Sequence, residues 1–140
     1  MIIIHKPMLL IIEDDMWIRS AMDVLFKDKY HIIHTNTAET GLTLIHNFQL
    51  DVVLAVDTLG GNLSGLGLLK VLRYEGNNTP VIIVSDKNIQ KAADYWGARK
   101  FILKPFAGEE IHLAVTRVIE SKKATETKTG PVMSLQMKMD

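Results

Sequence analysis

The chain has 140 residues, of which 47% are hydrophobic, enough for the buried core of one domain. Sixteen basic residues balance sixteen acidic ones, so no strong field draws the protein to nucleic acid or to an anionic membrane. The absence of cysteine excludes disulfides and thiolate chemistry, and it favours a location in the reducing cytoplasm.

Five short apolar runs rich in β-branched residues recur along the chain, each of a length typical of a buried strand. They are residues 8–12, 31–35, 52–56, 81–84 and 101–103. Segments with helical apolar spacing alternate with them, at residues 18–25, 38–48, 68–72, 88–96 and 111–118, with Gly97 as the predicted cap of the fourth. This alternation predicts a doubly wound α/β domain, a parallel sheet with helices on both faces.

The two ends of the chain lack this pattern. Residues 1–7 form an apolar leader that is too short for a signal peptide or a membrane span. Beyond Glu120 the sequence becomes polar and loses its periodicity, so residues 121–140 are expected to form a flexible tail or a linker cut short of an effector domain. The predicted domain therefore spans residues 8–120.

Reactive side chains follow four of the predicted strands. They are Glu13, Asp14 and Asp15 after the first strand, Asp57 after the third, Ser85 after the fourth, and Lys104 with Pro105 after the fifth. Ligands bind at the carboxyl ends of the strands in such sheets, so these side chains are expected to share a pocket. Gathered carboxylates repel unless they are protonated or share a cation, and a set of hard oxygen ligands favours Mg²⁺.

Lys104 and the Ser85 hydroxyl suit the oxygens of a phosphoryl group. A carboxylate can act as a nucleophile and form an aspartyl phosphate, for which Asp57 is the natural acceptor. Taken singly, each residue has a simpler interpretation: Glu13 and Asp14 in an acidic first helical turn, Asp57 in a turn, Lys104 in solvent. Their joint placement at strand ends favours the phosphoryl site.

Four segments resemble the receiver domains of bacterial response regulators. They are LLIIEDD at 9–15, VDTLGGNLSGLGLLKVLR at 56–73, VIIVSD at 81–86 and GARKFILKPF at 97–106. The resemblance covers about residues 8–120. It implies a flavodoxin-like fold with five parallel strands in the order 2-1-3-4-5.

The resemblance also implies roles for single residues. The residues implied to bind Mg²⁺ are Glu13, Asp14, the phosphoacceptor Asp57 and the backbone carbonyl of Leu59. The residues implied to bind the phosphoryl group, or to change conformation when it is bound, are Ser85, Lys104 and Phe101. The peptide bond before Pro105 is implied to be cis. The implied partners are a sensor histidine kinase or phosphotransfer protein, and an output domain or downstream protein.

The segment after Asp57 departs from the family's pattern. Gly61 stands where the family usually has proline, and Ser64 stands where it usually has an acid, which makes the loop looser. The segment between Ser85 and Gly97 is a few residues shorter than usual, so we expect an abbreviated fourth helix and an atypical output.

The acceptor position has two competing registers. Family members usually carry an acid five residues before the acceptor, whereas Asp51 precedes Asp57 by six, and counting from Asp51 puts Val56 at that position. Counting back from Gly65, which matches a family glycine, returns the position to Asp57. The second count has the stronger anchor, and a strand also accommodates a buried Val56 more readily than a buried carboxylate.

Three functions are compatible with these observations. The leading hypothesis is a signalling domain rather than an enzyme, phosphorylated on Asp57 in a Mg²⁺-dependent reaction, which then switches an output. The alternative is a phosphorylation-independent pseudo-receiver that acts as a protein-interaction module. A small metal-dependent phosphatase is the third, but Asp57 lacks the nearby second acid that such enzymes use as acid and base.

Overall fold

The computed structural model describes the backbone of residues 5–139 and the side chains of residues 5–123. The elements in chain order are β1 (Met8–Ile12), α1 (Met16–Phe26), β2 (His31–Thr35), α2 (Ala38–Asn47), β3 (Val52–Val56), α3 (Gly65–Tyr74), β4 (Val81–Ser85), α4 (Gln90–Tyr95), β5 (Lys100–Leu103) and α5 (Gly108–Met139). The strands form one parallel sheet in the order β2-β1-β3-β4-β5, which confirms the predicted fold.

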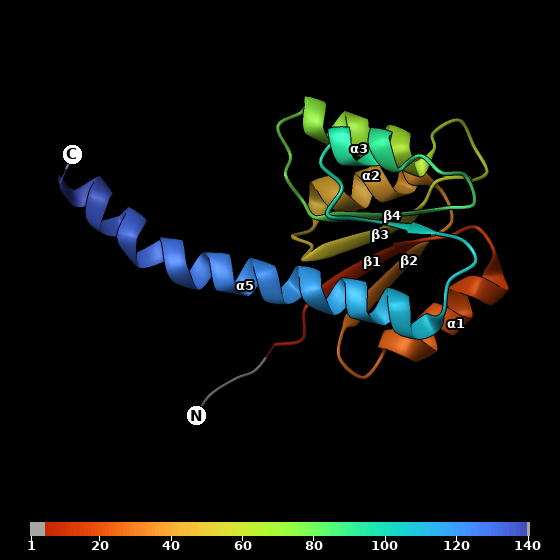
Figure 1. Cartoon of the computed structure of the whole chain (residues 1–140), viewed down its shortest axis with the longest axis horizontal. Helices are drawn as coiled ribbons and strands as arrows, with labels where there is room; N and C mark the ends of the chain where they lie inside the picture. The colour runs from red at the N-terminus through yellow and green to blue at the C-terminus, as the bar shows by residue number, and fades with distance from the viewer. Residues whose placement is uncertain (1–4, 140) are drawn as a thin grey trace.

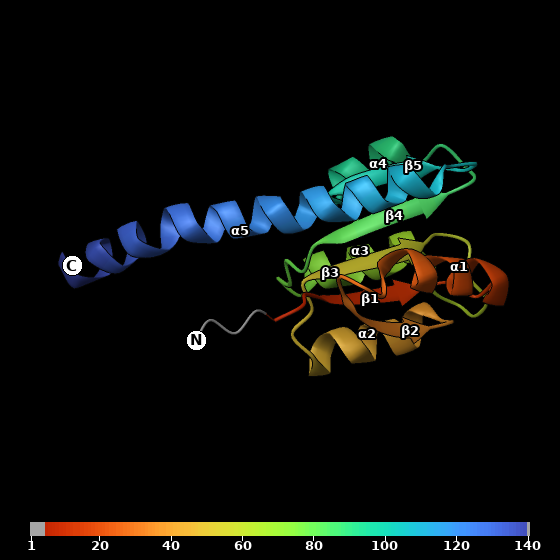
Figure 2. The same ribbon diagram turned by 90° about the horizontal axis from the view of Figure 1, so that it is seen from below.

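Helices cover both faces of the sheet, with α1 and α5 on one side and α2, α3 and α4 on the other (Figures 1 and 2). Successive strand side chains point to opposite faces, so Leu9 and Ile11 of β1 pack toward α1 and α5 while Leu10 and Ile12 pack toward α2 and α3. Burial on both faces explains why the strands are continuously apolar.

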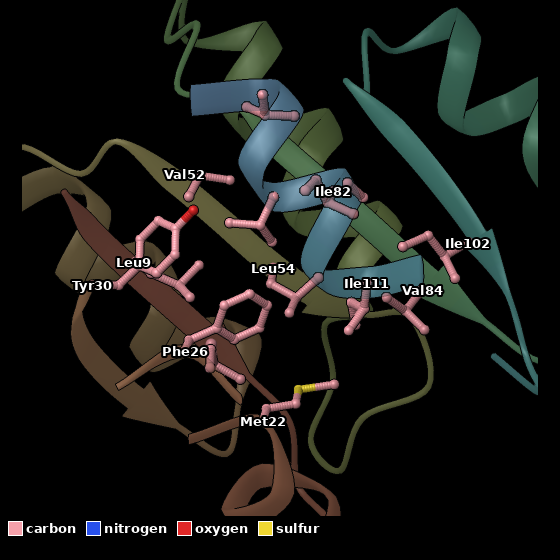
Figure 3. Packing of buried hydrophobic residues seen from close by; sticks show 14 of the residues in the cluster. Leu9, Met22, Phe26, Tyr30, Val52, Leu54, Ile82, Val84, Ile102 and Ile111 are labelled. Atoms are coloured by element: carbon pink, nitrogen blue, oxygen red, sulfur yellow. The ribbon is translucent and has the colours of Figure 1, made fainter. Parts of the chain in front are cut away.

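The core on the α1 and α5 side is built from long aliphatic and aromatic side chains. Phe26 of α1 and Ile111 of α5 pack around Leu54 of β3 (Figure 3), and all three side chains are at most 1% exposed. Burial of each such side chain contributes roughly 1.5–3 kcal/mol. This packing holds β3, and hence the residues that follow it, against the two helices.

Three helices begin with a polar capping residue, which follows the loop after the preceding strand. Asp15 caps α1 by accepting from the backbone N–H groups of Trp17 and Ile18, and Thr37 caps α2 by accepting from Thr40. Ser64 caps α3 by accepting from Gly67 at 2.9 Å. These caps satisfy backbone donors that have no partner within the helix.

The two ends of the chain lie outside the strand and helix pattern of the predicted domain. The first four residues of the apolar leader lie outside the described residues, and Pro7 accepts a backbone hydrogen bond from His31 at 2.9 Å. At the other end α5 extends to Met139 and leaves the body of the domain (Figure 1), so the backbone of 121–139 is helical, and its expected role as a linker stays a prediction. Residues 121–129 include three lysines, one glutamate and one alanine, which are strong helix formers, beside three threonines, which are weaker ones.

The fourth helix is short, as expected, and has only six residues. Gly97 follows it with φ at +82°, the left-handed conformation that a glycine adopts at low cost. None of the described helices is both long and apolar enough to cross a membrane.

Candidate functional site

The strand pairing shows which residue of β3 lies level with the acidic residues after β1. Ile12 pairs with Ala55, so the next positions set Glu13 beside Val56 and Asp14 beside Asp57. On the other side Val56 pairs with Val84, and the Asp57 N–H donates to the Val84 carbonyl at 2.8 Å. Asp57, rather than Val56, is therefore level with Asp14 and Ser85 at the carboxyl edge of the sheet.

The extra residue between Asp51 and Asp57 is accommodated before β3 begins. Asp51 lies just outside the strand, where its carboxylate accepts from the Met8 N–H at 2.7 Å and from Lys122 Nζ at 3.0 Å. Val56 is 3% exposed and packs with the α1 and α5 core, so its side chain and that of Asp57 leave the strand on opposite faces.

Gly65 allows α3 to begin directly against the end of β3. A Cβ atom at this position would lie 2.5 Å from the Val56 carbonyl oxygen and 2.9 Å from its carbon. The Gly65 N–H donates to the Asp57 carbonyl at 3.0 Å. Only a glycine permits this approach, which places the first turn of α3 next to Asp57.

The Asp57 carboxylate faces α3. Its Oδ1 atom accepts from the Leu66 N–H at 3.0 Å, in the first turn of the helix. The side chain is thus held by one backbone amide at the positive end of a helix, which stabilises a negative charge.

Glu13 lies on the other side of the edge and is 1% exposed. Its Oε1 atom accepts from the Asp15 N–H at 3.0 Å, whereas Oε2 is buried and has no hydrogen-bond partner. Burial raises the pKa of Glu13, with a smaller contribution from Asp14, and the Asp15 N–H and the charge of Lys104 oppose this rise. A buried carboxylate with one unpaired oxygen is a strong candidate to meet a cation.

A cavity with a volume of about 270 cubic Å opens between β1, β3, β4 and β5. It is lined by Glu13, Asp14, Asp15, Ile18, Val56, Thr58, Ser85, Asp86 and Lys104. Four of the predicted site residues therefore meet here, namely Glu13, Asp14, Ser85 and Lys104. Asp57 is not among the lining residues, and within residues 5–123 no three acidic or histidine side chains are grouped closely enough to hold a metal.

The loop between β3 and α3 is held by carboxylates on two sides. Asp14 Oδ2 accepts from the Gly60 N–H at 3.1 Å, and Glu39 Oε2 of α2 accepts from the Asn62 N–H at 3.0 Å. Gly61 has φ at +97°, and a Cβ atom there would lie 3.2 Å from both Glu39 carboxylate oxygens. Leu59, the predicted carbonyl ligand, belongs to this loop and is half-buried.

The remaining predicted residues lie around the end of β4 and along β5. Ser85 is 1% exposed, and its hydroxyl accepts from the Lys87 N–H at 3.0 Å. Phe101 is half-buried and packs on the α3 and α4 side of the sheet. The Lys104–Pro105 peptide bond is cis, the geometry that the family resemblance implies.

Sequence reasoning missed three contributors to this region. Thr58 and Asp86 each follow a predicted site residue by one position, and this place in the sequence was the available signal. Glu39 gave none, because an acid in the first turn of α2 is explained by the helix dipole alone. Its contact with Asn62 spans 23 residues and depends on the fold.

The donor set suits Mg²⁺ in kind. The cavity presents carboxylate oxygens, with no thiol or imidazole among its lining side chains, and the unpaired Glu13 Oε2 has a coordination position to offer a cation. Asp57 does not line the cavity, and its Oδ1 atom is bonded to the Leu66 N–H. The donor types therefore suit a hard cation, and Glu13 and Asp14 are the acidic members of the predicted set that line the cavity.

A family model described as the response regulator receiver domain matches residues 9–116. The chain is 33% identical over 121 residues to the uncharacterized transcriptional regulatory protein YcbL of Bacillus subtilis, a match that covers 84% of this chain and 52% of that protein. It is 27% identical over 133 residues to the cell cycle transcriptional regulator CtrA of Caulobacter vibrioides, covering 89% of this chain and 56% of CtrA. The chain thus spans about half the length of these curated relatives.

Solved structures of receiver domains are also similar to this chain. The receiver domain of the Francisella response regulator 1452 superposes with a TM-score of 0.77 at 26% identity, covering 84% of this chain and 99% of that domain. A CheY-like receiver domain protein from Methanospirillum hungatei shares the fold with a TM-score of 0.79 at 19% identity, covering 86% of this chain and 98% of that one. The chain belongs to the response regulator receiver domain family of two-component signalling systems.

Proposed function

We propose that this receiver is phosphorylated on Asp57 in a Mg²⁺-dependent reaction and thereby switches a signalling output. The observation that carries the proposal is the sheet register, which sets Asp57 level with Asp14 and Ser85 at the carboxyl edge. Ser85 and Lys104 both line the cavity at the same edge, so a hydroxyl and a cationic side chain occur together beside the proposed acceptor.

The transfer forms one bond and breaks another. A carboxylate oxygen of Asp57 attacks the phosphorus of a phosphohistidine, the P–N bond breaks, and its electron pair returns to the imidazole. The Ser85 hydroxyl and the Lys104 ammonium would meet the phosphoryl oxygens, which carry the negative charge. In this proposal the Asp57 side chain first releases the Leu66 N–H and then turns toward Ser85 and Lys104.

Glu13, Asp14, Asp57 and the Leu59 carbonyl would hold the Mg²⁺ ion in this proposal. When bound, the ion offsets the charge of the gathered carboxylates and of the transferred group. The buried Glu13 Oε2 supports this assignment, because its lack of a partner is otherwise unfavourable. Phe101 would move with Ser85 as the switch, next to the short α4.

The proposed partners are a sensor histidine kinase or phosphotransfer protein and an output domain or downstream protein in the cytoplasm. The relatives YcbL and CtrA are named as transcriptional regulators, and this chain matches about half of each. We propose that residues 8–120 form the receiver and that the rest of α5 connects it to its output.

One observation favours a second function, that of a pseudo-receiver which binds its partner without phosphorylation. The Asp57 carboxylate is bonded to α3, and Asp57 does not line the cavity that holds Glu13 and Lys104. If this arrangement persists, Asp57 serves the fold of α3 and the domain acts as an interaction module.

Intact mass after incubation with acetyl phosphate and Mg²⁺ separates the two functions. Wild type should gain one phosphoryl group, Asp57→Asn should gain none, and chelation of Mg²⁺ should prevent the gain. Asp94→Asn, which removes an exposed carboxylate from α4, is the matched control and should react like wild type. An unmodified wild-type chain that is folded by circular dichroism contradicts the first function, and partner binding retained in Asp57→Ala then supports the second.

A further inference from the structure

Asp57 acts as an external cap for α3. The first three helical residues are Gly65, Leu66 and Gly67, and each N–H group has an acceptor in the structure. Gly65 donates to the Asp57 carbonyl at 3.0 Å, Leu66 to the Asp57 carboxylate at 3.0 Å, and Gly67 to the Ser64 hydroxyl at 2.9 Å. Two of the three acceptors thus belong to Asp57, from outside the helix.

The N-terminus of α3 has no acid of its own. The other helices longer than α4 carry one or more in the cap or first turn: Asp15 in α1, Glu39 in α2, and Glu109 with Glu110 in α5. In α3 the cap is the neutral Ser64, and the first turn contains no acidic residue. Asp57 therefore supplies the only negative charge bonded to the first-turn amides of α3 within the described residues.

The two acceptor oxygens are neighbours. Ser64 Oγ and Asp57 Oδ1 accept from successive amides of one helical turn, which point in nearly the same direction. A charge at the side chain of residue 64 would therefore act on the Asp57 carboxylate at short range. An acidic cap would also neutralise the helix end that attracts Asp57.

We propose that Ser64 is a positioning residue for the phosphoacceptor: its neutral cap leaves the N-terminus of α3 to the Asp57 carboxylate and holds that carboxylate away from the cavity. The inference rests on the proposed function of Asp57 as acceptor. Occupation of the cavity by a cation must then break the bond between Asp57 and the Leu66 N–H. An acidic residue at position 64 shifts Asp57 toward the cavity and makes it more reactive.

The test compares Ser64→Asp with Ser64→Asn. Asparagine has nearly the same shape as aspartate but no charge, and both residues are good helix caps, so α3 should be retained in both variants. Thr37→Asp is a further control, because it introduces the same acid at the neutral cap of α2. With acetyl phosphate and Mg²⁺, Ser64→Asp should be phosphorylated about two- to fivefold faster than wild type, the size of a helix-terminus charge effect. Ser64→Asn and Thr37→Asp should react at the wild-type rate.

Hydrogen exchange of the Leu66 amide gives a readout that does not require phosphorylation. The amide should exchange about two- to fivefold faster in Ser64→Asp than in Ser64→Asn, and Mg²⁺ alone should accelerate it in wild type. Equal phosphorylation rates and equal Leu66 exchange in the two Ser64 variants would overturn the positioning role. Faster Leu66 exchange in Ser64→Asp without phosphorylation of any variant would support that role while contradicting the acceptor function.

Discussion

The two ends of the sheet use charged residues in opposite ways. At the amino end, Arg73 donates to the carbonyl oxygens of Asn77, Thr79 and Gly97 at 2.8 to 3.1 Å. Asp51 at the same end accepts from Met8 and Lys122. At the carboxyl end, by contrast, Glu13 keeps a buried oxygen without a partner.

This difference separates groups that maintain the fold from groups that are available for a ligand. A charged side chain whose bonds are made, such as Arg73, fixes the loops around it. A buried carboxylate with an unmade bond is unfavourable in the isolated domain, and a cation removes that penalty. Asp57 is intermediate, because it lies at the carboxyl end but bonds to the backbone of α3.

The largest effect should come from Gly65→Ala at the carboxyl end. The new Cβ would collide with the Val56 backbone, which cannot move without displacing β3, so we expect a loss of about 3 kcal/mol or more in the free energy of unfolding. Urea denaturation measures it. Gly108→Ala, whose Cβ would lie 4.0 Å from its nearest neighbours, should change stability by less than about 0.5 kcal/mol. If Gly65→Ala unfolded with nearly the same free energy as wild type, the close approach of α3 to β3 would be contradicted.

Arg73→Ala should destabilise the amino end without affecting the site. The three carbonyl oxygens lose a charged donor, which is expected to cost about 2 kcal/mol in urea denaturation. Arg99→Ala removes an exposed neighbouring arginine and should cost less than about 0.5 kcal/mol. If Arg73→Ala changed the affinity for Mg²⁺ severalfold, the two ends would not be independent.

Mg²⁺ should stabilise the domain through the carboxyl end. At a concentration ten times its dissociation constant, a bound ion adds about 1.4 kcal/mol to the free energy of unfolding. Thermal unfolding with and without the ion measures this gain, which should shrink in Asp14→Asn and persist in Asp94→Asn. An equal gain in all three proteins would indicate unspecific ion binding.

Glu13→Gln should increase the free energy of unfolding, whereas most substitutions at buried positions decrease it. Because burial raises the pKa of Glu13 above the ordinary value of 4.5, its stability contribution is complete below that value and is lost as the pH rises through the raised pKa. Without Mg²⁺ the variant should therefore be more stable than wild type at neutral pH, by about 1 kcal/mol. The difference should vanish in acid. Parallel pH profiles of the two proteins would contradict this account.

Much of the fold could be predicted because the signals are local. The five strands follow from short, largely apolar runs of three to five residues, and helices such as α1 follow from their apolar spacing. The helical backbone of 121–139 was missed, because that segment lacks an apolar stripe and composition alone gave a polar tail. The register of β3 was ambiguous from Asp51, whose bond to Met8 spans 43 residues.

The sequence by itself determined the order of the elements and the residues that reach the carboxyl edge, Glu13, Asp14, Asp57, Ser85 and Lys104. Periodicity and strand ends are properties of neighbouring residues, so they can be read along the chain. Only the tertiary structure decided that Glu13 is desolvated with an unpaired oxygen and that Asp57 faces α3. These states depend on partners brought together by folding, as in the bond between Asp14 and Gly60, which spans 46 residues.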